Sequence, residues 1–375
     1  MTVAARPAVP FLDFAAHVAA LRPELEAALA RVLDSGHFIL GPEGEAFEQE
    51  LARATESKHA VAVANGTDAI ELALRVRGIG AGDEVVTSPL TAPFTVLAIL
   101  AAGARPVFAD LDPLTLNVSP EGVANAVGPR TKALLPVHLY GNPADLDPLR
   151  ALAGERGLSL VEDACQAVGA RYHGRVVGTN GLGALSFYPT KNLGALGDGG
   201  AVLAADAGEA ARLRELRNGG QGGEKYRHEV VGVNSRLDEM QAAILRVGLR
   251  HLEAWTERRR ALAALYDREL AGLPLGLPRE QPGARSVYHL YVVRHPRRDA
   301  LRAALQARGV GTLVHYPIPL HRQPAFRSLF GGGTSFPEAE RAATEVLSLP
   351  LHPAMTDAQA QTVSAALRAA LEAIA

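Results

Sequence analysis

Short apolar runs alternate with longer helical patterns along the first two-thirds of the chain. Seven of these runs predict strands, at residues 59–64, 83–87, 106–109, 133–137, 159–162, 184–187 and 200–204. Alanine- and leucine-rich segments such as 67–75 and 147–155 lie between many of them and predict helices. Strands that are apolar throughout and separated by helices are typical of a largely parallel sheet covered on both faces. Ligands of such sheets bind outside the carboxyl ends of the strands.

The last third of the chain has a different pattern. Residues 236–271 contain few helix breakers and predict one or two helices, which end in a Gly- and Pro-rich loop at 272–283. Beyond this loop the pattern predicts a strand at 288–293, a helix at 299–308 and a closing helix at 356–374. We therefore expect a large α/β domain at residues 1–250, with a mixed, mostly parallel sheet flanked by helices. A smaller α+β domain is expected at residues 251–375.

Composition excludes several classes of protein. A net charge of −2 and a pI near 6.6 provide no basic field for nucleic acid or an anionic membrane. The single cysteine, Cys165, excludes an internal disulfide and a cysteine-rich metal site. The most apolar stretch, 96–104, is too short to span a bilayer, and residues 1–10 carry no secretory signal pattern. We expect a cytoplasmic protein that uses no metal, nucleic acid or membrane.

Lysine is rare in this chain, which makes each lysine informative. Of the 38 lysines and arginines, only Lys58, Lys132, Lys191 and Lys225 are lysine. An amine can lose its proton and attack a carbonyl, whereas a guanidinium cannot. Lys58 and Lys132 are interpreted as surface residues. Lys191 lies on a glycine-rich turn between two predicted strands, where the backbone can approach a planar ligand, so its amine is a candidate for Schiff-base formation.

Two other segments could complete a site around this amine. Gly66 and Thr67 follow a predicted strand and begin a helix, where free amides favour an anion such as phosphate. The alternative is that Thr67 or Asp68 only caps the helix. Asp163 follows another strand and could hold a ring nitrogen protonated, or it could be a buried, hydrogen-bonded acid. Pyridoxal phosphate needs an amine, an acid and a phosphate cup, and these segments supply all three.

Seven segments together resemble the DegT–StrS-type sugar aminotransferases, which are pyridoxal-phosphate enzymes of the aspartate aminotransferase fold (fold type I). The segments are residues 36–42, 63–69, 136–141, 162–167, 186–200, 234–243 and 315–321. The resemblance implies a cofactor that alternates between pyridoxal and pyridoxamine 5'-phosphate. It also implies glutamate as the amino donor, a nucleotide-linked ketosugar as the acceptor, and a homodimer with shared active sites.

The resemblance assigns catalytic roles to two residues and a cofactor contact to a third. Lys191 would hold the cofactor covalently and later move a proton between cofactor and substrate carbons. Asp163 would pair with the pyridine nitrogen, and Gln166 would contact the ring hydroxyl. Cys165, which lies between them, is interpreted as a small core residue because no histidine accompanies it locally.

Phosphate binding is assigned to residues from both subunits. The backbone amides of Gly66 and Thr67 and the hydroxyl of Ser186 would hold the phosphate of their own subunit. Asn234 would reach the phosphate of the neighbouring subunit. From the sequence alone Asn234 could instead cap the helix that begins near Arg236, and the two roles are compatible.

Four further residues are candidates for contacting the substrate: Tyr188, Lys225, His315 and His321. Lys225 lies in a glycine-rich loop that could deliver a cation to a sugar diphosphate; the alternative is a solvated loop lysine. The two histidines could equally be ordinary polar loop residues.

One segment departs from the family pattern. Many relatives have an aromatic residue at the position of Ala92, where it stacks on the cofactor ring. Here either the alanine methyl group packs on the ring or Phe94 swings in to replace the aromatic side chain.

Lysine at position 191 favours transamination, because relatives with histidine there act as dehydratases. Residues 192–200 resemble members that act at sugar C3, which favours a thymidine-diphosphate-linked 3-keto-6-deoxyhexose. A uridine-diphosphate-linked 3-keto sugar or a 4-keto sugar is the alternative. Two other classes compete: a non-catalytic regulatory protein on the same fold, and a lyase or desulfurase, which would need a nucleophile that Cys165 does not provide.

Overall fold

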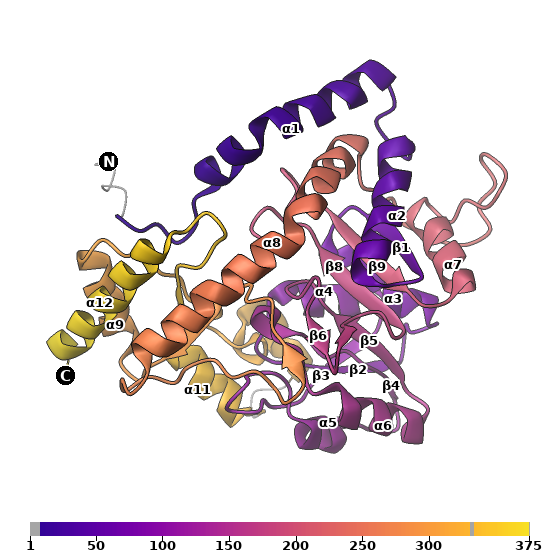
Figure 1. Cartoon of the computed structure of the whole chain (residues 1–375). Helices are drawn as coiled ribbons and strands as arrows, with labels where there is room; N and C mark the ends of the chain where they lie inside the picture. The colour runs from indigo at the N-terminus through magenta and orange to yellow at the C-terminus, as the bar shows by residue number, and fades with distance from the viewer. Residues whose placement is uncertain (1–7, 331–333, 375) are drawn as a thin grey trace.

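The computed structural model describes residues 8–330 and 334–374, and its centre is a seven-stranded sheet (Figure 1). The strand order is β1-β9-β8-β5-β4-β2-β3. In chain order these strands are β1 (His59–Val63), β2 (Glu84–Thr87), β3 (Arg105–Phe108), β4 (Thr131–Leu134), β5 (Ser159–Asp163), β8 (Leu182–Ser186) and β9 (Gly200–Ala204). All seven predicted strands are present. Only β9 runs antiparallel to its neighbours, so the sheet is mixed and mostly parallel, as predicted.

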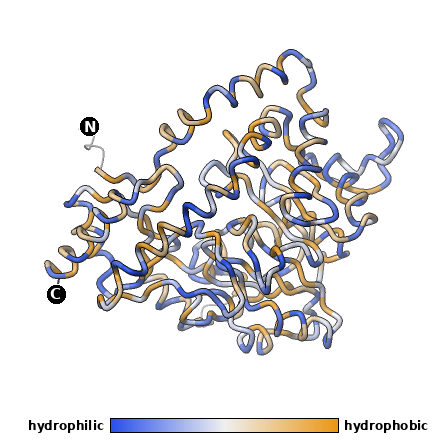
Figure 2. The backbone as a smooth tube through the Cα atoms, in the orientation of Figure 1, coloured by the Kyte–Doolittle hydropathy of each residue, from blue (hydrophilic) through white to orange (hydrophobic). Residues whose placement is uncertain are grey.

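Both faces of the sheet are buried, which explains why its strands are apolar at every position. Along β9, Ala201 and Leu203 pack into one hydrophobic cluster, whereas Val202 and Ala204 pack into another. The flanking helices are α2 (Pro42–Thr55), α3 (Gly66–Val76), α4 (Pro93–Ala101), α5 (Pro120–Ala126), α6 (Leu146–Arg156) and α7 (Ala207–Arg217). Hydrophilic positions gather outside this core, for example in the loop that projects beyond α7 (Figure 2).

The long helix α8 (Glu239–Leu270) connects the sheet to the C-terminal part of the chain. It is a single helix of 32 residues, where the sequence allowed one or two. Helix α1 (Phe14–Ser35) packs against its first half through Leu25 and Val32, and α12 (Asp357–Ile374) packs against its second half. Residue 250 lies within α8, and the predicted domain boundary there stays a prediction.

The C-terminal part combines a two-stranded antiparallel sheet with helices, in agreement with the expected α+β character. Strand β11 (Tyr291–Arg294) pairs with β12 (Val346–Leu349), and Tyr266 of α8 is buried in the same core. The helices here are α9 (Arg298–Ala307), α10 (Arg327–Phe330) and α11 (Pro337–Glu345). Short elements complete the fold: β6 (Arg171–Tyr172), β7 (Arg175–Val176), β10 (Ala284–Arg285), and the 3-10 turns η1 (Leu139–Gly141), η2 (Leu320–Arg322) and η3 (Pro324–Phe326). No helix among the described residues is long and apolar enough to cross a membrane.

A buried carboxylate joins α8 to α2. The side chain of Glu239 is 1% exposed and accepts hydrogen bonds from the backbone amides of Gly41 (2.9 Å), Glu43 (2.7 Å) and Gly44 (2.9 Å). These amides lie at the N-terminus of α2, where a negative charge is favoured by the helix dipole. A Cβ atom at Gly44 would lie 2.7 Å from the Glu239 carboxylate, so glycine allows the close approach.

Replacing this carboxylate tests how much the junction contributes to stability. We expect Glu239→Gln to lower the free energy of unfolding by about 2 kcal/mol, because a neutral amide binds the three N–H groups less strongly and adds a donor without a partner. Thermal and denaturant unfolding would measure the change. Glu372→Gln makes the same replacement at an exposed position of α12 and should leave the unfolding curve unchanged; equal curves for both variants would contradict the prediction.

Candidate active site

The turn between β1 and α3 forms a cup for an anion. The side chain of Asn65 caps α3 by accepting a hydrogen bond from the Asp68 amide (2.9 Å). The amides of Gly66 and Thr67, at the N-terminus of the helix, have no hydrogen-bond partner in the described part of the chain. A Cβ at Gly66 would lie 2.7 Å from the Cβ of Ser186, so only glycine lets the end of β8 approach. Two amides and a hydroxyl therefore converge, and this donor set suits a phosphate.

Strand β9 closes on the same turn. Gly200 is the sheet partner of Ser186, and a Cβ at Gly200 would lie 2.3 Å from the carbonyl oxygen of Asn65. The cup thus depends on a second glycine, which comes from the strand that follows Lys191. Three segments that are distant in the sequence form one anion site.

Asp163 ends β5 and is 3% exposed. Its two carboxylate oxygens are held separately: Thr95 donates its hydroxyl to Oδ2 (2.8 Å), and the Cys165 amide donates to Oδ1 (3.1 Å). The orientation of the carboxylate is therefore fixed. The sequence provided no signal for Thr95, which lies inside an apolar helical segment.

Gln166 is fixed in the same way by two tyrosines that the sequence did not predict. Its side-chain oxygen accepts the Tyr140 amide (2.7 Å), and its side-chain nitrogen donates to the Tyr316 hydroxyl (3.1 Å). Tyr140 donates its own hydroxyl to the carbonyl of His315. These bonds tie the segment after β5 to the segment 315–321.

Lys191 lies on the turn after β8, where its amide donates to the Tyr188 carbonyl (2.8 Å). Burial lowers the pKa of the Lys191 amine below its ordinary value, although the charge of Asp163 opposes this shift. A lowered pKa increases the fraction of neutral, nucleophilic amine. Burial raises the pKa of the Cys165 thiol well above its ordinary value, so the thiol stays protonated and is a poor nucleophile.

Two neutral histidines lie in the electrostatic neighbourhood of Lys191. Burial, and then the charge of Lys191, lowers the pKa of His315 to about 4; its Nδ1 lies 2.8 Å from the Ser348 hydroxyl. His289 was missed by the sequence because it falls inside a predicted strand. Burial and the charge of Lys191 also lower the pKa of His289, and its Nδ1 lies 3.3 Å from the side-chain oxygen of Asn192.

Other predicted site residues lie at the surface. Asn234 is exposed and forms a β-bridge with Asn218; the residue that caps α8 is Asp238, so the predicted capping role of Asn234 is wrong. Lys225 is exposed on the projecting loop, with its ammonium 5.1 Å from the centre of the Tyr226 ring. The side chain of Tyr188 is 53% exposed.

His321 is buried in the C-terminal part. Its Nε2 lies 2.8 Å from a carboxylate oxygen of Glu340, and its ring contacts Phe108 and Phe336. None of these contacts is with Lys191 or Asp163. Its predicted role in substrate binding stays a prediction.

The segment that departs from the family pattern begins α4. Ala92 is the N-cap residue of this helix, and the side chain of Phe94 is 58% exposed. The side chain of Phe94 therefore lies largely outside the core, and which of the two residues packs on the cofactor ring stays a prediction.

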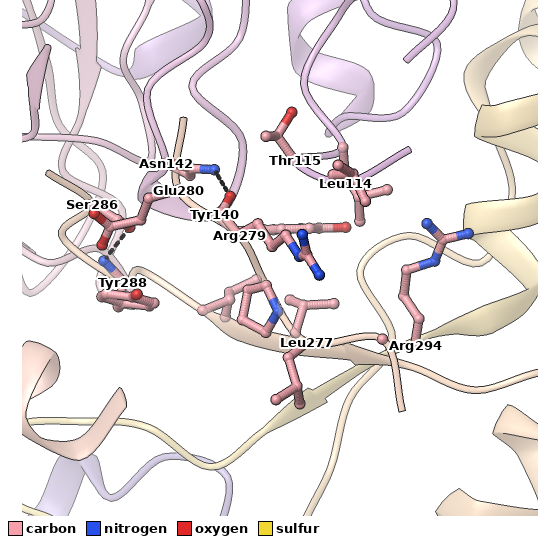
Figure 3. Close-up of a pocket in the computed structure, with 15 residues that line it drawn as sticks. Leu114, Thr115, Tyr140, Asn142, Leu277, Arg279, Glu280, Ser286, Tyr288 and Arg294 are labelled. Carbon is pink, nitrogen blue, oxygen red and sulfur yellow. Dashed lines mark hydrogen bonds between the residues drawn. The ribbon is translucent and has the colours of Figure 1, made fainter. Parts of the chain in front are cut away.

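Two cavities border this region. One, partly open to solvent, is lined by Lys191 together with residues of α1, α8 and the segment 352–354. The other lies between η1 and the loop around Arg279, and it contains none of the predicted site residues (Figure 3). Two arginines, Arg279 and Arg294, line this second cavity, and Arg294 is paired with Glu345.

Within the described ranges, no group of three or more His, Cys, Asp or Glu side chains could hold a metal ion.

Comparison with known proteins agrees with this arrangement. The model of the DegT/DnrJ/EryC1/StrS aminotransferase family matches residues 20–368. The dTDP-3-amino-3,4,6-trideoxy-alpha-D-glucose transaminase of Streptomyces venezuelae is 53% identical over 364 residues, 96% of each chain. The erythromycin biosynthesis sensory transduction protein EryC1 of Saccharopolyspora erythraea is 50% identical, over 96% of this chain and 99% of its own.

A solved structure extends the likeness to three dimensions. The X-ray structure of S. venezuelae DesV in complex with a ketimine intermediate has a TM-score of 0.95 to this chain, at 53% identity. The match covers 98% of this chain and 99% of that one. The family resemblance and the α/β fold predicted from the sequence are confirmed. The chain belongs to the DegT/DnrJ/EryC1/StrS family and is an aminotransferase.

Proposed function

We propose that this aminotransferase binds pyridoxal phosphate and moves an amino group from glutamate to a thymidine-diphosphate-linked 3-keto-6-deoxyhexose. The observation that carries the proposal is the half-buried Lys191, whose amine has a lowered pKa and interacts electrostatically with Asp163. The phosphate cup at Gly66 and Ser186 supplies the remaining requirement of the cofactor. The family, whose members use pyridoxal phosphate, and the relative named as a dTDP-amino-sugar transaminase support the assignment.

Each group at the site has a distinct task. When bound, pyridoxal phosphate supplies an electron-withdrawing ring that stabilises negative charge on the reacting carbon. The cup would hold its phosphate, and Asp163, fixed by Thr95 and the Cys165 amide, would keep the ring nitrogen protonated. The neutral Nζ of Lys191 would take a proton from one carbon and return it to another. Gln166 would orient the ring through its hydroxyl.

The sugar assignment rests on the resemblance of residues 192–200 to enzymes that aminate C3, and on the names of relatives. A uridine-diphosphate-linked 3-keto sugar is the alternative, since a 44% identical relative is named as an aminotransferase of a UDP-linked 3-dehydro sugar. The sensory name of the S. erythraea protein corresponds to the non-catalytic hypothesis. A protein without chemistry would not need Lys191, Asp163 and Gly66 at the same edge of the sheet, and this favours the enzyme.

The surface positions of Asn234 and Lys225 support a homodimer with shared sites. Both are exposed: Lys225 lies on the loop that projects beyond α7, and Asn234 lies at its base, where it forms a β-bridge with Asn218. The same loop exposes apolar side chains, with Tyr226 at 81% and Val231 at 84%. We infer that this loop contacts a second copy, where Asn234 would reach the phosphate and Lys225 the sugar diphosphate.

Lys191 provides the direct test of the chemistry. The wild-type protein should absorb visible light after addition of pyridoxal phosphate and lose this absorption with glutamate. Lys191→Ala should turn over at least about 1,000-fold more slowly, because no amine remains to move the proton. Lys58→Ala, which removes an exposed lysine, should behave as wild type. A wild-type protein that stays colourless, or repeated turnover by Lys191→Ala, would contradict the proposal.

The pH dependence of cofactor uptake follows from the lowered pKa of Lys191. Because the neutral amine attacks the carbonyl, uptake should speed up as the pH rises through the pKa of Lys191 and then level off. The midpoint should lie below the ordinary lysine value of 10.5. Stopped-flow mixing of apoprotein with pyridoxal phosphate measures it, and a midpoint at or above 10.5 would contradict the burial argument.

Gly66 tests the cup separately. We expect Gly66→Ala to weaken binding of pyridoxal phosphate by about tenfold or more, because the added Cβ would push Ser186 away from the two amides. Gly154→Ala is the matched control: it lies on α6, with no atom within 4 Å of the new Cβ. Titration of apoprotein with the cofactor measures both affinities, and equal values would show that the turn is not the phosphate site.

The ketosugar that accepts the amino group can be identified by the change in its mass when the ketone becomes an amine. The pyridoxamine form would be incubated with thymidine- and uridine-diphosphate-linked 3-keto and 4-keto sugars, and the products read by mass spectrometry. Faster conversion of the thymidine-linked 3-keto sugar supports the assignment. If another sugar nucleotide of the panel is converted faster, that sugar is the acceptor and the assignment is wrong.

A further inference from the structure

Ser235 is a fully buried serine that bonds both ends of the phosphate cup. Its hydroxyl accepts a hydrogen bond from the Ala64 amide (3.0 Å) and donates one to a carboxylate oxygen of Asp68 (2.5 Å). A backbone amide can only donate and an ionised carboxylate can only accept, so the direction of both bonds is fixed. Gly66 and Thr67, whose amides form the cup, lie between these two partners in the sequence. The hydroxyl therefore holds the two ends of the turn together.

The backbone of Ser235 forms part of the base of the loop that projects beyond α7. The Val233 amide donates to the Leu216 carbonyl (2.8 Å), and the next bond of this pattern runs from the Ser235 amide to the Arg217 carbonyl (2.8 Å). Asn234 lies between these two bonds. Its backbone is fixed on both sides, and its exposed side chain extends from a base that hydrogen bonds hold in place.

The other stem of the loop is also bonded to the strand that leads into the cup. Arg217 donates from Nη1 to the Ala62 carbonyl (2.6 Å) and to the Glu48 carboxylate (2.5 Å), which in turn accepts the Ala62 amide (3.0 Å). Strand β1 is the last strand on this side of the sheet, so these groups bond its free edge. Both stems of the loop are thus attached to the cup or to the strand before it.

The neighbour of Ser235 in the sequence would act on the other subunit. Asn234 is exposed, and in the homodimer proposed above it would reach the phosphate of the neighbouring subunit. Consecutive Cα atoms are held about 3.8 Å apart, so a displacement of Ser235 also displaces Asn234. The two residues would therefore contact the cofactor sites of different subunits while sharing one set of hydrogen bonds.

We propose that Ser235 is a positioning residue for both cofactor sites of the dimer. Its hydroxyl closes the phosphate cup of its own subunit and fixes Asn234 for the phosphate that the partner holds. The inference rests on the proposed function, because it needs the cup to bind phosphate and Asn234 to reach a second copy. A serine with a purely local structural role would affect only the subunit that carries it.

Mixed dimers separate these two effects. Wild-type and Ser235→Ala chains with different affinity tags would be coexpressed, and dimers with one chain of each kind would be isolated as apoprotein and titrated with pyridoxal phosphate. Borohydride reduction makes the link to Lys191 permanent, and mass spectrometry then gives the loaded fraction of each chain separately. Half-loading of both chains should need about tenfold more cofactor than in the wild-type dimer, because the variant has a looser cup and the wild-type chain receives a displaced Asn234.

Asp68→Asn is a milder second variant. The amide keeps the shape of the carboxylate but accepts the Ser235 hydroxyl less strongly, so it should raise half-loading of both chains of a mixed dimer by about threefold. Ser364→Ala is the matched control, because this buried serine donates to the Ala360 carbonyl of its own helix (3.0 Å) in α12. Both chains of its mixed dimer should load as wild type does.

The loading of the wild-type chain decides the outcome. Normal loading of this chain opposite Ser235→Ala and opposite Asp68→Asn would overturn the inference, because the hydroxyl would then act only within its own subunit. Differently tagged chains that do not copurify would overturn it as well. A wild-type dimer that traps no cofactor would contradict the proposed function itself, and the inference with it.

Discussion

The close approach of the β1–α3 turn to strands β8 and β9 is the constraint on which the site depends. Glycine at positions 66 and 200 removes the side chains that would hold these segments apart. Because β1, β5 and β8 run in one direction, the cup, Asp163 and the Lys191 turn all follow carboxyl ends of strands. A sheet with another strand order would separate them, whatever the local sequence.

The sheet could be predicted because both of its faces are buried, which leaves continuous apolar runs that are easy to recognise. Strand β12 was not predicted: its four residues precede Pro350, and only pairing with β11 defines them as a strand. Helix α1 was also not predicted, since it contains Pro23 and is stabilised by packing against α8. A helix or strand that is stabilised by pairing or packing with a segment distant in the chain is difficult to predict from its own residues.

The same distinction holds at the site. Lys191, Asp163 and Gly66 were found because each lies in a local motif after a strand. Thr95 and His289 were not, because their roles arise from contacts with residues 68 and 97 positions away. The capping role of Asn234 was wrong for a related reason: Asp238, closer to the helix, provides the better-placed side chain.

The uninterrupted course of α8 also limits how this protein can diverge. Glu239 and Arg259 lie on the same helix, separated by about 30 Å along its axis. One bonds the N-terminus of α2, and the other borders the cavity beside Lys191. A single inserted residue between them would rotate one end by about 100° relative to the other and turn Arg259 away from its cavity. Evolution can therefore exchange exposed side chains along this helix, but insertions and deletions should be confined to the loops outside it.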